Sequence, residues 1–113
     1  MIKIAGAILL AENNGVSLNS LDFDHIIEKI RPNFRDSEDL VRDEIYSPVD
    51  DGGMSFISLK EQNSDGFNAF VRAALIAYES EISEQPLSSH RSSWDELMTA
   101  LRSDPRTENS SNG

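Results

Sequence analysis

The longest regular pattern of hydrophobic and polar positions in the chain lies over residues 63–83. Its apolar residues recur at the three- and four-residue spacing that marks one face of an α-helix. These residues are Phe67, Phe70, Val71, Ala74, Leu75, Tyr78 and Ile82. Ser64 or Asp65 can cap the start, and Pro86 ends the pattern because proline has no amide hydrogen. Four further apolar residues, Ala69, Ala73, Ile76 and Ala77, form a second face. The pattern therefore predicts a central helix over about 65–83, packed on two sides.

Three shorter amphipathic patterns predict helices over about 21–31, 37–46 and 94–102. The helix over 37–46 has a narrow apolar stripe, so most of it is expected to face solvent. The last helix follows Ser93, which forms a capping box with Glu96. The apolar positions expected in the core are Phe23, Ile26, Ile27, Ile30, Leu40, Val41, Ile45, Trp94, Leu97, Met98 and Leu101.

Two segments have features of strands. Residues 45–49 and 54–60 flank an Asp-Asp-Gly-Gly turn, which is typical of a β-hairpin over about 45–60. Residues 2–12 are apolar and end at Asn13-Asn14-Gly15. Their alanines and paired leucines favour a helix, whereas the alternation of Ile2, Ile4, Ile8 and Leu10 is that of a strand. We expect a helix here; the alternative is a strand over residues 2–10.

The predicted fold is mainly α: a small bundle of four to five helices around the central helix, with one short hairpin. The alternative is an α+β fold in which residues 2–10 form a strand. We expect residues 1–102 to form a single globular domain and residues 103–113, which lack apolar anchors, to form a disordered tail. The apolar run over residues 4–11 is too short to span a membrane, and we assign it to the core.

The chain is strongly acidic, with 20 acidic and 10 basic residues and a formal net charge of −10. This charge repels nucleic acid and anionic lipid, and it favours a basic protein partner. The absence of cysteine excludes disulfides and thiolate zinc sites, and it suits the cytoplasm.

Two groups of residues could carry chemistry. Asp22, Asp24, His25 and Glu28 fall within two helical turns, where carboxylates and an imidazole could converge on a metal ion. The sequence Ser88-Ser89-His90-Arg91 places hydroxyl groups beside an imidazole. Neither group matches a ligand or nucleophile motif. We therefore expect no catalytic residues, no metal site, no cofactor and no enzymatic activity.

The most acidic stretch, residues 36–51, is called here the acidic segment. It contains seven carboxylates and one basic residue, Arg42. A cationic cleft on another protein could accept these carboxylates, with a tyrosine as anchor. The predicted partner-binding residues are Asp39, Asp43, Glu44, Tyr46, Asp50 and Asp51. This prediction requires the carboxylates to be free of arginines from the same chain.

The acidic segment, the small size, the missing cysteines and the helical pattern together resemble small acidic bacterial immunity proteins. The chain is similar in style to those that neutralise toxins of contact-dependent growth inhibition. The resemblance implies a cytoplasmic, antitoxin-like protein, monomeric before complex formation, that inhibits a basic toxin domain, a nuclease. It extends over the whole chain and rests on no motif, so the predicted binding residues come from the charge pattern. The alternatives are an acidic secretion chaperone or adaptor that binds a partner protein, and a small hydrolase that depends on His25 or His90.

Overall fold

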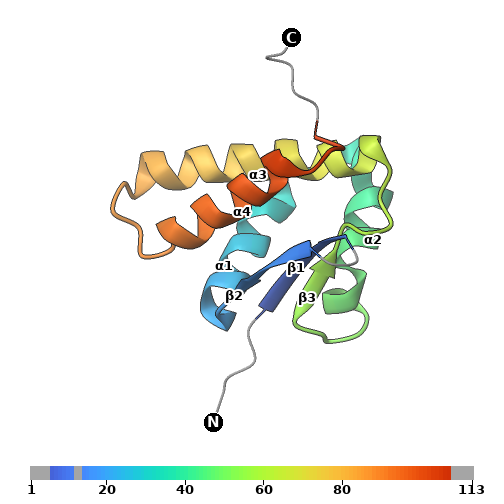
Figure 1. The fold of residues 1–113 in the computed structure, drawn as a ribbon, viewed down its shortest axis with the longest axis horizontal. Coiled ribbons are helices and arrows are strands. Elements are labelled where there is room, and N and C mark those ends of the chain that lie inside the picture. Colours follow the sequence, from blue (N-terminus) through green and yellow to red (C-terminus); the bar gives the residue numbers. More distant parts are fainter. Residues whose placement is uncertain (1–5, 12–13, 108–113) are drawn as a thin grey trace.

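The computed structural model describes residues 6–11 and 14–107, which form a three-stranded sheet packed against helices (Figure 1). The elements in chain order are β1 (Gly6–Ala11), β2 (Asn14–Leu18), α1 (Ser20–Ile30), η1 (Arg31–Asn33), η2 (Asp36–Glu38), α2 (Asp39–Asp50), β3 (Phe56–Ser58), α3 (Ser64–Glu84) and α4 (Arg91–Ser103). The two η elements are single 3₁₀ turns. The protein is mainly helical, but the sheet makes it an α+β fold rather than a pure bundle. None of the helices in the described residues combines the length and the hydropathy needed to cross a membrane.

The strands lie in the order β2-β1-β3, with β1 antiparallel to β2 and parallel to β3. In this register Ile8 of β1 lies between Val16 of β2 and Ile57 of β3. All three side chains are buried. Because alternate residues of a strand point to opposite faces, this row and Leu10 form the side of the sheet that meets the helices.

The expected N-terminal helix is wrong for residues 6–11, which form β1 as in the α+β alternative. Ile8 and Leu10 are fully buried, whereas Ala7 and Leu9 between them are only partly buried. β1 also runs close to α1: a Cβ atom at Gly6 would lie 2.1 Å from Cγ of Phe23, so only glycine fits there. Residues 2–5 and 12 lie outside the described part of the chain.

The expected hairpin over residues 45–60 is also wrong. Residues 45–50 belong to α2, and β3 pairs with β1 rather than with the residues just before it in the sequence. The glycine-rich turn ends a helix instead of joining two strands: Gly53 has a φ of 63° and donates its N–H to the carbonyl of Val49. Pro48 lies in the last turn of α2, where it cannot donate a hydrogen bond to the carbonyl of Glu44.

The helix predicted over about 65–83 is present as α3, capped by Asn63, whose side chain accepts from the N–H of Gly66. Its buried residues include Phe67, Phe70 and four alanines. On the second predicted face the three alanines are buried and Ile76 is 45% exposed, and on the first face Leu75 is 37% exposed. Near its C-terminus α3 also buries Glu81, which the apolar pattern did not indicate.

The predicted core faces of α1 and α4 are confirmed. Their caps differ from expectation. Asn19, not Ser20, caps α1 by accepting from the N–H of Asp22. The predicted capping box at Ser93 is absent because α4 begins at Arg91, and the Ser93 hydroxyl donates to Asp22 on α1 instead.

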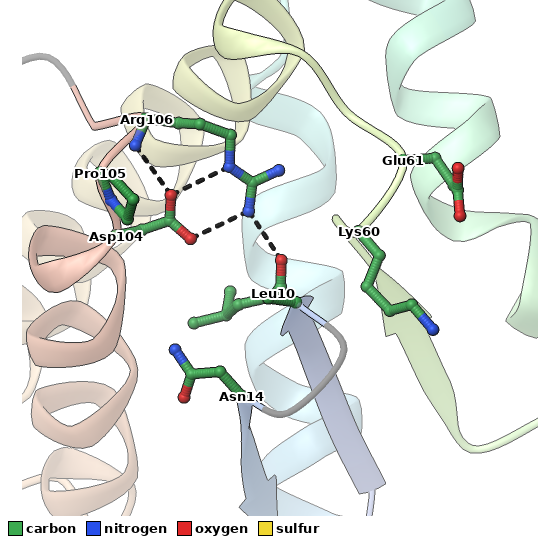
Figure 2. A pocket seen from close by; sticks show the side chains of 8 residues that line it. Leu10, Asn14, Lys60, Glu61, Asp104, Pro105 and Arg106 are labelled. Atoms are coloured by element: carbon green, nitrogen blue, oxygen red, sulfur yellow. Dashed lines mark hydrogen bonds and ion pairs between the residues drawn. The ribbon is translucent and has the colours of Figure 1, made fainter.

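The packed part of the chain extends beyond residue 102. Asp104 is buried, and Arg106 donates to the carbonyls of Leu10, Leu59 and Gln62. Figure 2 shows this guanidinium group between Asp104 and the end of β1. Segment 104–107 thus ties the end of α4 to the sheet, beside an open hollow of about 540 Å³. Residues 108–113 lie outside the described part.

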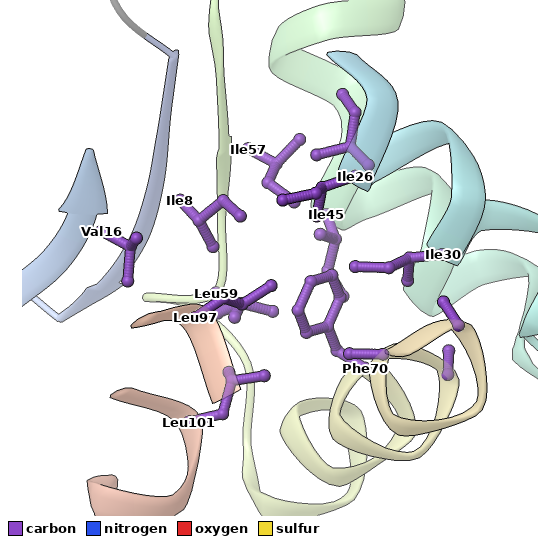
Figure 3. Packing of buried hydrophobic residues seen from close by; sticks show 14 of the residues in the cluster. Ile8, Val16, Ile26, Ile30, Ile45, Ile57, Leu59, Phe70, Leu97 and Leu101 are labelled. Carbon is purple, nitrogen blue, oxygen red and sulfur yellow. The ribbon is translucent and has the colours of Figure 1, made fainter. Parts of the chain in front are cut away.

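One hydrophobic core fills the space between the sheet and the helices (Figure 3). The strands contribute Ile8, Val16 and Ile57, and the helices close over them with residues from α1, α2, α3 and α4. The prediction that Leu40 belongs to the core is wrong, since its side chain is 84% exposed.

Candidate functional site

The acidic segment forms η2, α2 and the turn after α2. Ile45 and Tyr46 point into the core, and Val49 packs against it. With 3.6 residues per turn, Asp43, Glu44 and Asp51 lie on the opposite side of the helix, and all three are exposed. We call the side formed by Leu40, Asp43, Glu44, the half-buried Ser47 and the C-cap residue Asp51 the outer face of α2.

Three of the predicted binding carboxylates are paired with arginines of the same chain. Arg42 lies 3.2 Å from Asp39 and 3.0 Å from Asp43. Arg31, at the end of α1, contacts both carboxylate oxygens of Asp50 at 3.0 Å. These bonds hold the pKa of Asp50 below its usual value. The prediction of unpaired carboxylates is therefore wrong for Asp39, Asp43 and Asp50.

Glu44 and Asp51 differ from these three. In the part of the chain that the structure describes, no hydrogen bond or ion pair reaches either carboxylate, and the same is true of Asp36. Glu44 and Asp51 lie on the outer face of α2, and Asp36 lies in the 3₁₀ turn before the helix. These are the charges of the acidic segment that remain available to a partner.

Tyr46 is not a surface residue. It is fully buried, and its hydroxyl donates to the carbonyl of Ile27 at 2.6 Å. The Arg31 guanidinium lies over its ring at 4.3 Å. Burial raises the pKa of the Tyr46 hydroxyl above its usual value. The prediction that Tyr46 contacts a partner is therefore wrong: its apolar ring serves the core.

Several negative charges of the acidic segment lie at positions where they do not stabilise α2. The C-terminus of a helix is its negative end, yet α2 ends at Asp50, is followed by Asp51 at the C-cap, and has no basic residue in its last turn. Asp39 and Asp43 are one turn apart, where like charges repel. Arginines offset part of this at Asp39, Asp43 and Asp50, but nothing in the described residues offsets it at Asp51.

The two histidines, which are 65 positions apart in the sequence, stack on each other with ring centroids 4.0 Å apart. His25 Nε2 lies 3.1 Å from a carboxylate oxygen of Glu81, and His90 Nδ1 lies 2.6 Å from one of Asp22. This contact could not be predicted from the sequence, because it joins α1 to the loop before α4. We call these four side chains the histidine cluster.

The histidine cluster lacks the geometry of a hydrolase. A serine nucleophile needs its hydroxyl hydrogen-bonded to the histidine that acts as base. Here the Ser88 hydroxyl donates to Glu81 and the Ser93 hydroxyl donates to Asp22, each at 2.6 Å. The carboxylates therefore take the bonds that a catalytic histidine would need.

Both carboxylates of the cluster are held ionised. Burial alone raises the pKa of Glu81, but hydrogen bonds from Ser88 and His25 outweigh burial, and the pKa lies below its usual value. The pKa of Asp22 is lowered in the same way by Ser93 and His90. The described residues hold no group of three or more side chains arranged to bind a metal ion. The cluster therefore fastens α1 to the C-terminal end of α3 and the start of α4.

The chain is similar to a known immunity protein in sequence and to a solved structure in fold. This relative is "Immunity protein CdiI" from Burkholderia pseudomallei, 31% identical over 103 residues, which cover 91% of this chain and 94% of the relative. The structure is that of a "CdiA-CT toxin from Burkholderia pseudomallei E479 in complex with cognate CdiI immunity protein". Its matching chain superposes with a TM-score of 0.85 at 31% identity, covering 92% of this chain and all of the other. No protein-family model matches the chain.

Proposed function

Because the chain belongs to the CdiI immunity proteins, we propose that it neutralises a CdiA-CT toxin by binding the toxin's basic domain through the outer face of α2. Members of this family inhibit toxins and are not enzymes. In our proposal the toxin domain is a nuclease, and the immunity protein is a monomer until it binds.

The choice of surface rests on Glu44 and Asp51, two carboxylates on one exposed helix side that have no partner among residues 6–11 and 14–107. Asp51 adds negative charge to the negative end of α2, so its charge opposes the stability of the free protein. Residues that break a local rule without a compensating contact are expected at functional sites. A lysine or arginine of the toxin would supply the missing contact.

The nuclease part of the proposal follows from charge complementarity. Enzymes that bind nucleic acid carry positive surfaces that contact phosphates. Carboxylates on α2 would occupy such a surface and repel the nucleic acid. Asp39, Asp43 and Asp50 add to the negative potential, although each also contacts an arginine of its own chain.

The test compares two double variants that each remove two exposed charges. Glu44→Gln with Asp51→Asn alters the outer face of α2; Glu79→Gln with Glu96→Gln alters α3 and α4, where both residues are exposed. Association with the cognate CdiA-CT toxin domain is followed by stopped flow at several salt concentrations. We expect the α2 variant to associate about tenfold more slowly at low salt and to show a weaker salt dependence, and the control to change less than twofold.

Equal association rates for both variants would remove the outer face of α2 from the proposal. The nuclease part has its own assay, the degradation of RNA and DNA by the toxin domain with and without the immunity protein. A toxin domain that degrades neither would refute it. Sedimentation of the free immunity protein as a dimer would refute the monomeric state.

A further inference from the structure

Leu40 is the exposed apolar residue of the outer face of α2. Its side chain is 84% exposed in the first turn of the helix, although leucine usually serves the core of an amphipathic helix. The core side of α2 is complete without it, because Ile45 is buried and Val41 and Val49 pack against the core. Around the helix, Leu40 lies opposite Val49 and points well away from Ile45.

An exposed leucine is common on protein surfaces, so the surroundings of Leu40 carry the inference. On a helix, residues three and four positions apart are neighbours. For Leu40 these neighbours are Asp43 and Glu44. The outer face therefore presents one apolar side chain bordered by carboxylates.

Charge and apolar contact contribute differently to an interface. Complementary charges at the rim raise the rate of association, whereas a central side chain that is fully desolvated slows dissociation. Tyr46, the anchor expected from the sequence, is buried in the core and cannot serve. We propose that Leu40 is the apolar anchor of the toxin interface and fills a hollow in the toxin domain bordered by lysine or arginine side chains.

This inference rests on the proposed function and refines it by separating the two roles. Glu44 and Asp51 govern association, and Leu40 governs dissociation. The partner that fits is a basic protein surface with an apolar hollow. A second copy of this chain does not fit, because two acidic faces would repel each other.

The experiment measures association and dissociation rates of Leu40→Ala with the cognate CdiA-CT toxin domain, by surface plasmon resonance. The matched control is Leu87→Ala, because Leu87 is 97% exposed in the loop between α3 and α4. We expect Leu40→Ala to dissociate about tenfold faster, equivalent to about 1.4 kcal/mol, with its association rate within about twofold of the unaltered protein. Leu40→Met should retain slow dissociation because it keeps an apolar side chain of similar volume. Thermal unfolding should show that all three variants are folded.

Unchanged dissociation of Leu40→Ala would overturn the assignment of the anchor. If Glu44→Gln with Asp51→Asn still slowed association, the proposed function would survive that result. Equally faster dissociation of Leu40→Ala and Leu87→Ala would also overturn the assignment of Leu40 as the anchor, because the effect would not be specific to the outer face. Failure of the unaltered protein to bind the toxin domain would overturn both proposals.

Discussion

Arg106→Met should destabilise the fold by about 3 kcal/mol, although residue 106 lies in a stretch without apolar anchors. The guanidinium group makes bonds of 2.7 to 2.9 Å to three main-chain carbonyls and to both oxygens of Asp104. It also lies over the ring of Phe67 at 4.2 Å. One side chain therefore joins the C-terminal segment to β1, to the loop after β3 and to α3.

The magnitude follows mainly from Asp104. Its side chain is 4% exposed, and bonds from Arg106 keep its pKa below the usual value. Removing one partner of a buried ion pair typically costs about 3–5 kcal/mol, because the other charge is left uncompensated. The open hollow beside the pair admits water to the freed carbonyls, so we expect the lower end of this range.

The assay is urea unfolding followed by circular dichroism, with Asp104→Asn and the double variant completing a cycle. The double variant should be more stable than Arg106→Met alone, because it leaves no unpaired buried charge. The direction in which stability changes with pH follows from the lowered pKa of Asp104. In the unaltered protein the pair stabilises the fold above about pH 4, the unfolded value for aspartate, and this contribution is lost as the pH falls through the folded value. The difference in unfolding free energy between the unaltered protein and Arg106→Met should therefore become smaller at acidic pH.

An Arg106→Met variant within about 0.5 kcal/mol of the unaltered protein would refute this reasoning, as would a gap that stays constant with pH. A chain that ends at residue 102 lacks both partners of the pair and should also be less stable. A chain that ends at residue 107 should match the full length if residues 108–113 form the predicted tail.

Two further predictions concern residues whose role differs from the sequence interpretation. Tyr46→Phe removes the buried bond to the carbonyl of Ile27 and should cost about 1–2 kcal/mol in urea unfolding without changing toxin association; weaker binding at unchanged stability would contradict the assignment of Tyr46 to the core. Glu81→Gln should cost about 2 kcal/mol at pH 7, because the Glu81 side chain is 1% exposed and its carboxylate is ionised and hydrogen-bonded. The lowered pKa of Glu81 means that the ionised carboxylate stabilises the fold above about pH 4. This contribution is lost as the pH falls through the folded pKa. The stability of Glu81→Gln should therefore vary less between pH 6 and pH 3 than the stability of the unaltered protein. Parallel pH profiles of the two proteins would contradict a stabilising role for the Glu81 charge.

The helices that could be predicted from the sequence are those whose core residues repeat along one face. In α1 the apolar residues Phe23, Ile26, Ile27 and Ile30 return with the helical period, and all four are buried. α4 follows the same rule with Trp94, Leu97, Met98 and Leu101. Burial on one side of a helix requires this local repeat, so the chain displays it without any knowledge of the partner elements.

The sheet could not be predicted in the same way, because its pairing is not local. β1 pairs with β3, about 50 positions further along the chain. The local sign of a strand is the alternation of Ile2, Ile4, Ile8 and Leu10, and it competes with alanines and leucines that favour a helix. The hairpin predicted at the turn after α2 is wrong for a different reason. Glycine at positive φ ends helices as readily as it joins strands, so the glycine-rich turn does not distinguish the two.

The side-chain pairs that define the surface come from distant segments as well. The charge pattern identified the acidic segment, but Arg31 reaches Asp50 from the end of α1, and His90 reaches Asp22 from the loop before α4. Such pairs depend on how the helices pack and leave no periodic trace. The burial of Tyr46 has a simpler cause, since it lies next to Ile45 on the core side of α2.

The arginines within the acidic segment bear on how the proposed interface would work. Arg42 contacts two carboxylates and Arg31 contacts Asp50 and Glu28, so the α2 surface stays negative after pairing. A toxin cation would compete with these arginines for Asp39, Asp43 and Asp50, but it would meet Glu44 and Asp51 without competition. The pairs also fix side chains that would otherwise lose rotamer freedom on binding, which lowers the entropy cost of association. On this argument Arg42→Gln should weaken toxin binding even though it makes the surface more negative, because it frees Asp39 and Asp43 to move. Faster association together with tighter binding of Arg42→Gln would show that charge alone governs the interface.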